Sequence, residues 1–224
     1  MAKVVNSITP FTLLDYPDKT ACILWYAGCN MRCLYCYNPE IVLGKGKFSF
    51  PEIVSFLQTR KGLLNAVVFS GGECLIHKEI ITHIRIVKAM GFLVKVDTNG
   101  SRPDVLAYLV TEQLLDYVAL DFKSDKGSFR YITQSDLFDP FEKSLQLLLK
   151  SGISFEVRTT YHSDLMDNND LNEMIAYLVN NAYTGNYYIQ NFRNNVATLG
   201  NLDHSIDLMD SEALRTTPLK VVFR

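Results

Sequence analysis

Apolar residues along this chain fall into short runs that alternate with longer stretches of helical periodicity. Short β-branched or aromatic runs occur at 21–26, 66–69, 92–96, 117–120, 154–158 and 187–190, with a further extended segment at 219–223. Apolar residues recur at helical spacing in the segments 50–57, 78–90, 103–113, 138–151 and 168–180. This alternation predicts βα units on a parallel sheet.

Six such units are too few for a complete eight-unit barrel. We therefore expect an α/β fold of the incomplete (β/α)6, TIM-like barrel type, with a short extra strand at the C-terminal end. The 224 residues contain no low-complexity tract, linker or short repeat. We expect one domain over residues 1–224, with a core barrel over about residues 20–193.

Polar clusters follow the C-terminal ends of the predicted strands. They comprise a cysteine-rich loop at 28–40, Gly71–Glu73, Asp97–Gly100, Asp121 with Lys123, Arg158, and Gln190 with Asn191. Barrel enzymes build their active sites at this rim. The positions therefore predict one shared site.

Composition narrows the possible functions. Hydrophobic residues make up 48% of the chain, which is ample for a core, and the net charge of -2 does not suggest nucleic-acid binding. The N-terminus lacks an apolar signal segment, and no apolar run approaches the roughly 18–20 residues that span a bilayer. We expect a cytoplasmic protein without a membrane partner. In such a protein, cysteines bind metals or take part in catalysis more often than they form disulfides.

Three of the five cysteines share one loop with the spacing C-x3-C-x2-C: Cys29, Cys33 and Cys36. Soft thiolates select zinc, copper(I) or an iron–sulfur cluster. Three thiolates would leave one iron of a four-iron cluster open. The alternative is a zinc site that takes a fourth ligand from His77 or Cys74. Otherwise we expect Cys74 and Cys22 to be buried as small apolar residues.

The cysteine motif, with Gly28 before it and Tyr35 as its aromatic residue, resembles the radical S-adenosylmethionine (SAM) superfamily. The resemblance implies a [4Fe-4S] cluster whose open iron chelates SAM, and reductive cleavage of SAM to a 5′-deoxyadenosyl radical. It places Tyr35 near the adenine. Because the cofactors carry the chemistry, we expect no catalytic residue beyond the cluster and SAM.

The turn formed by Gly71, Gly72 and Glu73 is a common pattern when taken alone. After an apolar strand, however, it resembles the superfamily segment that contacts the methionine ammonium. The glycines would allow close backbone approach, and Glu73 would support the positive charge.

Two strand-end segments resemble the glycyl-radical-enzyme activases: Asp97-Thr-Asn99-Gly and Asp121-x-Lys123. Read without that resemblance, they are a capping turn and an exposed charge pair. The resemblance places Asp97, Asn99 and Lys123 at the cofactor, with Lys123 paired to its carboxylate. Asp97 and Asp121 can also hold a monovalent cation there. Arg158 either reaches the cofactor or has a surface or salt-bridge role.

Residues 11–18 also resemble the activases, and they would bring Asp15 against the incoming glycine loop of a protein substrate. The alternative is that Asp15 belongs to a simple turn before Pro17. Tyr37 departs from the histidine of many activases. Gln190 replaces a histidine of pyruvate formate-lyase activase and favours the small activators of anaerobic ribonucleotide reductase.

The expected function is therefore generation of a glycyl radical on a partner enzyme, the anaerobic ribonucleoside-triphosphate reductase. A flavodoxin- or ferredoxin-type protein would donate the electron. One alternative is a small-molecule radical SAM enzyme similar to 7-carboxy-7-deazaguanine synthase. A second is a non-enzymatic metal-binding or electron-transfer module.

Overall fold

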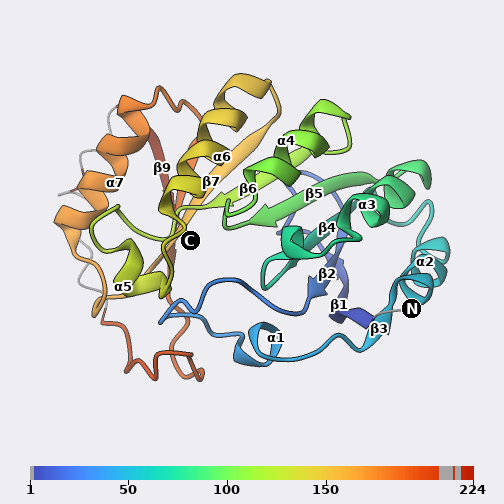
Figure 1. Ribbon diagram of the computed structural model, residues 1–224, viewed down its shortest axis with the longest axis horizontal. Helices are drawn as coiled ribbons and strands as arrows, with labels where there is room; N and C mark the ends of the chain where they lie inside the picture. The colour runs from blue at the N-terminus through green and yellow to red at the C-terminus, as the bar shows by residue number, and fades with distance from the viewer. Residues whose placement is uncertain (1–2, 207–213, 215–217) are drawn as a thin grey trace. The chain divides into compact units, whose positions relative to one another are not determined.

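The computed structural model describes residues 3–206, 214 and 218–224 (Figure 1). The chain divides into two compact units. The first comprises residues 1–30, 40–98 and 102–119, and the second comprises residues 31–39, 99–101 and 120–224. The assignment of residues 1–224 to one domain stays a prediction. Within the described part of the chain, no helix has the length and apolar character needed to cross a membrane.

The first unit contains a mixed sheet in the order β3-β1-β2-β4-β5. Its strands are β1 (Lys3–Thr12), β2 (Ala21–Tyr26), β3 (Phe48–Ser49), β4 (Ala66–Gly71) and β5 (Leu93–Thr98). β1 runs antiparallel to β2 and β3, whereas β2, β4 and β5 are parallel. Parallel neighbours need crossover connections, which the helices supply.

The helices of this unit are α2 (Phe50–Gln58), α3 (Ile80–Ala89) and α4 (Pro103–Thr111), with a short 3-10 turn η1 (Cys74–Ile76). A further short helix, α1 (Pro39–Val42), begins at the unit boundary. α3 packs along β5 (Figure 1). His83 of α3 stacks on the Phe50 ring at 3.7 Å, and burial lowers its pKa to about 4. His83 therefore packs inside this unit against the first residue of α2.

The second unit contains the parallel strands β7 (Phe155–Tyr161), β8 (Asn186–Asn191) and β9 (Lys220–Phe223) in that order. Its helices are α5 (Phe129–Thr133), α6 (Phe138–Ser151) and α7 (Asn168–Asn180). β6 (Tyr117–Asp121) passes from the first unit into the second. α6 ends at Gly152, whose φ of +72° suits glycine.

The predicted α/β class with mainly parallel strands is confirmed, as is the extra strand near the C-terminus. The expectation that 21–26 is the first strand was wrong, because β1 precedes it. β1 carries Asn6, Ser7 and Pro10 and buries its residues irregularly, so its pattern is not that of a strand. The other missed elements have five residues or fewer.

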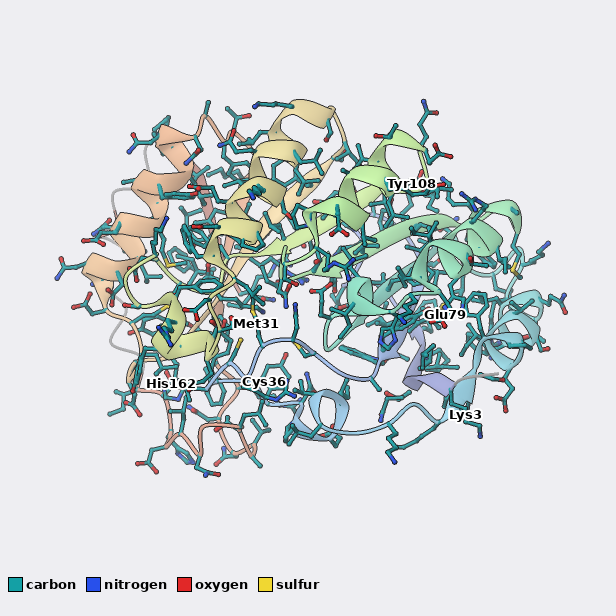
Figure 2. The ribbon with its side chains drawn as sticks, in the orientation of Figure 1. Lys3, Met31, Cys36, Glu79, Tyr108 and His162 are labelled. Carbon is teal, nitrogen blue, oxygen red and sulfur yellow. The ribbon has the colours of Figure 1, made fainter. Side chains whose placement is uncertain are left out.

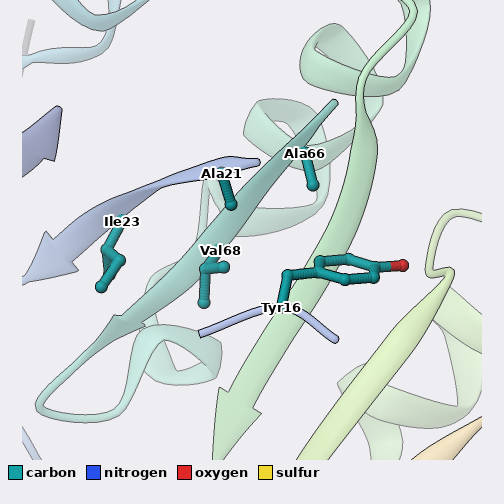
Figure 3. Packing of buried hydrophobic residues seen from close by; sticks show 5 residues of the cluster. All are labelled: Tyr16, Ala21, Ile23, Ala66 and Val68. Atoms are coloured by element: carbon teal, nitrogen blue, oxygen red, sulfur yellow. The ribbon is translucent and has the colours of Figure 1, made fainter. Parts of the chain in front are cut away.

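A small core cluster lies on one face of β2 and β4 (Figure 3). Ala21 pairs with Ala66 in register, and Ile23 pairs with Val68. These side chains leave room for the ring of Tyr16, which is buried against them. Tyr16 therefore anchors the chain between β1 and β2.

We expect Tyr16→Ala to lower the free energy of unfolding by about 3 kcal/mol, because it leaves a cavity in this cluster. Urea denaturation followed by circular dichroism would measure the change. Tyr131→Ala is the matched control, since Tyr131 is 63% exposed and its loss should cost less than about 0.5 kcal/mol. Equal losses for the two variants would contradict the anchoring role of Tyr16.

Candidate functional site

Cys29 follows β2 through a tight turn in the first unit. The Gly28 amide donates to the Ile41 carbonyl at 2.8 Å, and the Glu73 amide donates to the Gly28 carbonyl at 2.9 Å. Gly28 has a φ of +87°, a backbone conformation that other residues rarely adopt. These backbone hydrogen bonds thus fix the main chain directly before Cys29.

The predicted pair Gly71 and Gly72 packs against this turn. The Gly72 amide donates to the Tyr26 carbonyl at 2.9 Å. A Cβ atom at Gly72 would overlap the Gly28 carbonyl and lie 3.1 Å from the Cβ of Cys29. The glycines therefore bring two strand ends together beside Cys29. Their contact with the methionine ammonium stays a prediction.

Glu73 is fully buried and is held by hydrogen bonds. Its Oε1 accepts from the Leu75 amide at 3.0 Å and from the Thr98 hydroxyl at 2.9 Å. A buried carboxylate requires such donors. Glu73 thus caps η1 and links it to the end of β5, while its predicted role toward SAM is untested.

The two groups offered as a fourth zinc ligand are both engaged in hydrogen bonds. His77 Nε2 lies 2.9 Å from the Ala27 carbonyl oxygen, and burial lowers the pKa of His77. The Cys74 thiol donates to the Phe69 carbonyl at 3.6 Å, and burial raises its pKa well above the ordinary value. Cys22 and Cys74 are fully buried, as predicted.

Asp97 lies near the C-terminal end of β5 in the first unit. Its Oδ2 accepts from the Ser70 hydroxyl at 3.0 Å, and its Oδ1 lies 3.4 Å from Lys95 Nζ. Sequence reasoning missed Lys95, because one lysine in a strand is usually exposed to solvent. Its position among the apolar residues at 92–96 was the only available signal.

In the second unit, residues 31–36 form an irregular segment with a turn at 34–35, and two parts of the chain support it. Met31 and Cys36 mark its ends (Figure 2). The amides of Arg32 and Leu34 donate to the carbonyls of residues 133 and 132, both at 2.9 Å. Cys33 and Cys36 share a turn closed by a 3.0 Å bond from the Cys36 amide to the Cys33 carbonyl.

The second support comes from residues 199 and 200, which sequence reasoning missed. The Leu199 amide donates to the Cys36 carbonyl at 3.0 Å, and the Gly200 amide donates to the Leu34 carbonyl at 2.9 Å. Elsewhere in this unit, the Nε2 of buried His162 lies 3.1 Å from the Asp203 carbonyl oxygen. The cysteine segment is therefore held by a part of the chain more than 150 residues later.

Tyr35 is buried between Cys33 and Cys36. Its hydroxyl donates to the Lys123 carbonyl at 3.5 Å, and the Lys123 ammonium lies 6.0 Å from the ring centroid. Burial raises the pKa of Tyr35 well above its ordinary value, so the phenol stays protonated. This position suits a rigid apolar surface beside the cluster, and its contact with adenine stays a prediction.

Asp121 joins two cations in the second unit. Its Oδ2 lies 2.9 Å from Lys123 Nζ, and its Oδ1 accepts from Arg158 Nε at 3.0 Å and from Arg158 Nη2 at 2.9 Å. Burial alone would raise the pKa of Asp121, but Arg158 and Lys123 outweigh it and hold that pKa below its ordinary value. Arg158 Nη1 also lies 4.0 Å from Glu156 Oε1, so the two cations are paired with two carboxylates.

Three other predicted residues take local positions. The Asn99 Oδ1 accepts from the Ser101 amide at 2.9 Å, which is the capping turn considered from the sequence. The Asp15 carboxylate accepts from the Thr12 hydroxyl at 2.5 Å, and Tyr37 is 44% exposed. Contacts of Asn99 with the cofactor and of Asp15 with a protein substrate are untested.

The predicted residues thus form two groups, one in each unit. The first unit holds Asp15, Cys29, Gly71, Gly72, Glu73 and Asp97, and the second holds Cys33, Tyr35, Cys36, Asn99, Asp121, Lys123 and Arg158. The motif cysteines carry thiols rather than disulfides, as cluster ligands require. Among the described residues, no three His, Cys, Asp or Glu side chains are grouped so as to hold a single metal ion.

The sequence matches the family model described as "Radical SAM superfamily" over residues 23–178. A Methanocaldococcus jannaschii protein provisionally named a glycyl-radical enzyme activating enzyme is 32% identical over 184 residues, 78% of this chain and 75% of that protein. The pyruvate formate-lyase-activating enzyme of Clostridium pasteurianum is 27% identical over 79% of this chain and 76% of that enzyme.

The fold also resembles solved structures at low sequence identity. The crystal structure of Streptococcus suis SuiB bound to S-adenosylmethionine aligns with a TM-score of 0.68 and 14% identity, over 88% of this chain. This chain spans about half of SuiB, 48% of its length. The likeness therefore concerns the fold alone.

We expect Gly200→Val to loosen the cluster without unfolding the protein. A Cβ atom at Gly200 would lie 2.8 Å from the Leu34 carbonyl oxygen, so the added side chain must displace residues 34–36. Overpacking costs about 1–3 kcal/mol, so iron should be lost to a chelator about tenfold faster. Ala197→Val, at an exposed position of the same segment, is the control. Equal rates of iron loss would show that this support is dispensable.

Proposed function

Because the chain belongs to the radical SAM superfamily, we propose that it activates a glycyl-radical enzyme. Superfamily membership implies a [4Fe-4S] cluster and SAM as cofactors. The observation that carries the proposal is similarity to two activating enzymes over about three quarters of their lengths. The strand-end segments at Asp97 and Asp121 support it, because they match the activase pattern.

Cys29, Cys33 and Cys36 would hold the cluster, and their thiols and supporting backbone contacts fit that role. When bound, the cluster and SAM supply a 5′-deoxyadenosyl radical that removes a hydrogen atom from a glycine. The residues of this chain bind and orient these groups. Tyr35 contributes a buried, uncharged surface within the cysteine loop.

We propose that the Asp121 group recognises the carboxylate of SAM. Arg158 lies within ion-pair distance of both Asp121 and Glu156. Among the described residues, Lys123 pairs with Asp121 alone, so it is the cation offered to a second carboxylate. The side chains of Lys123 and Arg158 are 18% and 14% exposed, so water screens them little but they remain accessible. Asp121 holds both cations in place, and Lys123 has three donors with which to bind a second carboxylate.

The proposed partner is the anaerobic ribonucleoside-triphosphate reductase, with a flavodoxin- or ferredoxin-type electron donor. Gln190 and Asn191, which end β8, favour this branch over pyruvate formate-lyase activation. Leu13 and Leu14, beside Asp15, are 63% and 87% exposed. They offer apolar surface where the resemblance places the incoming glycine loop.

Cys33→Ala should abolish cluster assembly, because two thiolates cannot hold a cluster that needs three. Iron content and the visible spectrum after anaerobic reconstitution would measure this. Cys22→Ala is the matched control, since Cys22 is buried in β2 outside the motif. Unchanged iron in the Cys33 variant, or one zinc and no iron in the native protein, would contradict the cluster assignment.

Electron paramagnetic resonance tests the partner. The reduced protein, SAM and the candidate reductase together should produce a glycyl doublet, which should vanish when any one of them is omitted. A doublet without this protein would contradict the activase proposal. SAM cleavage without a doublet on any glycyl-radical enzyme would favour the small-molecule alternative similar to 7-carboxy-7-deazaguanine synthase.

A further inference from the structure

Lys95 is the buried lysine of the first unit, and its side chain is 2% exposed. Its ammonium donates to the Asp15 backbone carbonyl at 2.5 Å and lies 3.4 Å from Asp97 Oδ1. The Tyr117 ring centroid lies 5.6 Å from the same nitrogen. A buried ammonium requires such partners, because moving it out of water is costly.

These contacts connect two segments that the sequence analysis treated separately. Asp15 follows β1 in the segment proposed to meet a protein substrate, whereas Asp97 lies near the end of β5. Tyr16 strengthens the connection, because its buried ring lies 5.7 Å from the Tyr117 ring. The Asp15 segment is thus attached at adjacent residues, through the Asp15 carbonyl and the Tyr16 side chain.

We propose that Lys95 is a positioning residue whose ammonium fixes the Asp15 segment and serves as the resident cation of the Asp97 carboxylate. The first role follows from the hydrogen bond to the Asp15 carbonyl. The second follows from charge, because Asp97 is 11% exposed and its carboxylate needs a positive partner close by.

The role of Lys95 as the resident cation changes the expectation of a monovalent cation at Asp97. The sequence predicted a monovalent cation at Asp97, but an ammonium already lies within ion-pair distance of this carboxylate. Binding of SAM should therefore depend little on added potassium or sodium. The effect on SAM binding rests on the proposed position of Asp97 at the cofactor, whereas the effect on the Asp15 segment does not.

The test compares wild type, Lys95→Met and Lys95→Arg as full-length reconstituted proteins. Hydrogen exchange of the amides at 12–16 should be about tenfold faster in Lys95→Met, because the segment loses its attachment. Calorimetric titration with SAM in choline chloride should give about tenfold weaker binding for Lys95→Met, with partial recovery in potassium chloride. Choline is too large to replace the lost ammonium. Wild type and Lys95→Arg should bind equally in both salts.

Lys88→Met is the matched control, because Lys88 also pairs with a carboxylate of this unit, Asp116, at 2.9 Å. It should behave as wild type in both measurements. If Lys95→Met does not fold, Lys95→Gln replaces it and should show the same salt-dependent loss. The proposal is overturned if the neutral variant keeps wild-type exchange at 12–16, or if wild type itself needs potassium for binding. Neither measurement includes a partner enzyme, so failure of the activase proposal would leave them interpretable.

Discussion

The backbone of residues 26–28 passes so close to residues 71–72 that no side chain fits between them. Cys29 follows Gly28 directly after this contact, and Glu73 follows Gly72 on the other side of it. Hydrogen bonds from the amides of Gly72 and Glu73 then set the direction of both chains. Glycine is required here for backbone packing, independently of any ligand. A loop that must present a thiol accurately depends on this rigid contact between two strand ends.

Buried charge is the second constraint on the site. Glu73 is satisfied by donors from η1 and β5, Asp97 lies beside Lys95, and Asp121 lies between two cations. Each carboxylate is thereby oriented before any ligand arrives. In the second unit Arg158 also pairs with Glu156, so two carboxylates balance the two cations of the Asp121 group. Lys123, whose side chain is 18% exposed, is the cation of this group that we propose for an anionic group of the cofactor.

The sequence alone predicted some of these features and missed others. The apolar runs located β2, β4, β5, β6, β7 and β8, because each has a local pattern. Local motifs likewise identified the three cysteines and the strand-end carboxylates. β1 was missed because its polar residues and its proline break the usual pattern of a strand. Lys95 was missed because its burial depends on Asp15, 80 residues earlier. Gly200 was missed for the same reason, since its contact with Leu34 exists only after folding.

The support of the cysteine segment by residues 199 and 200 has a consequence for the order of events during synthesis. The amides that hold Leu34 and Cys36 belong to residues translated more than 150 residues after the cysteines. Until then the loop lacks one of its two supports. Stable insertion of iron and sulfide would therefore follow the translation of residue 200, and the nascent thiols must be kept reduced until then.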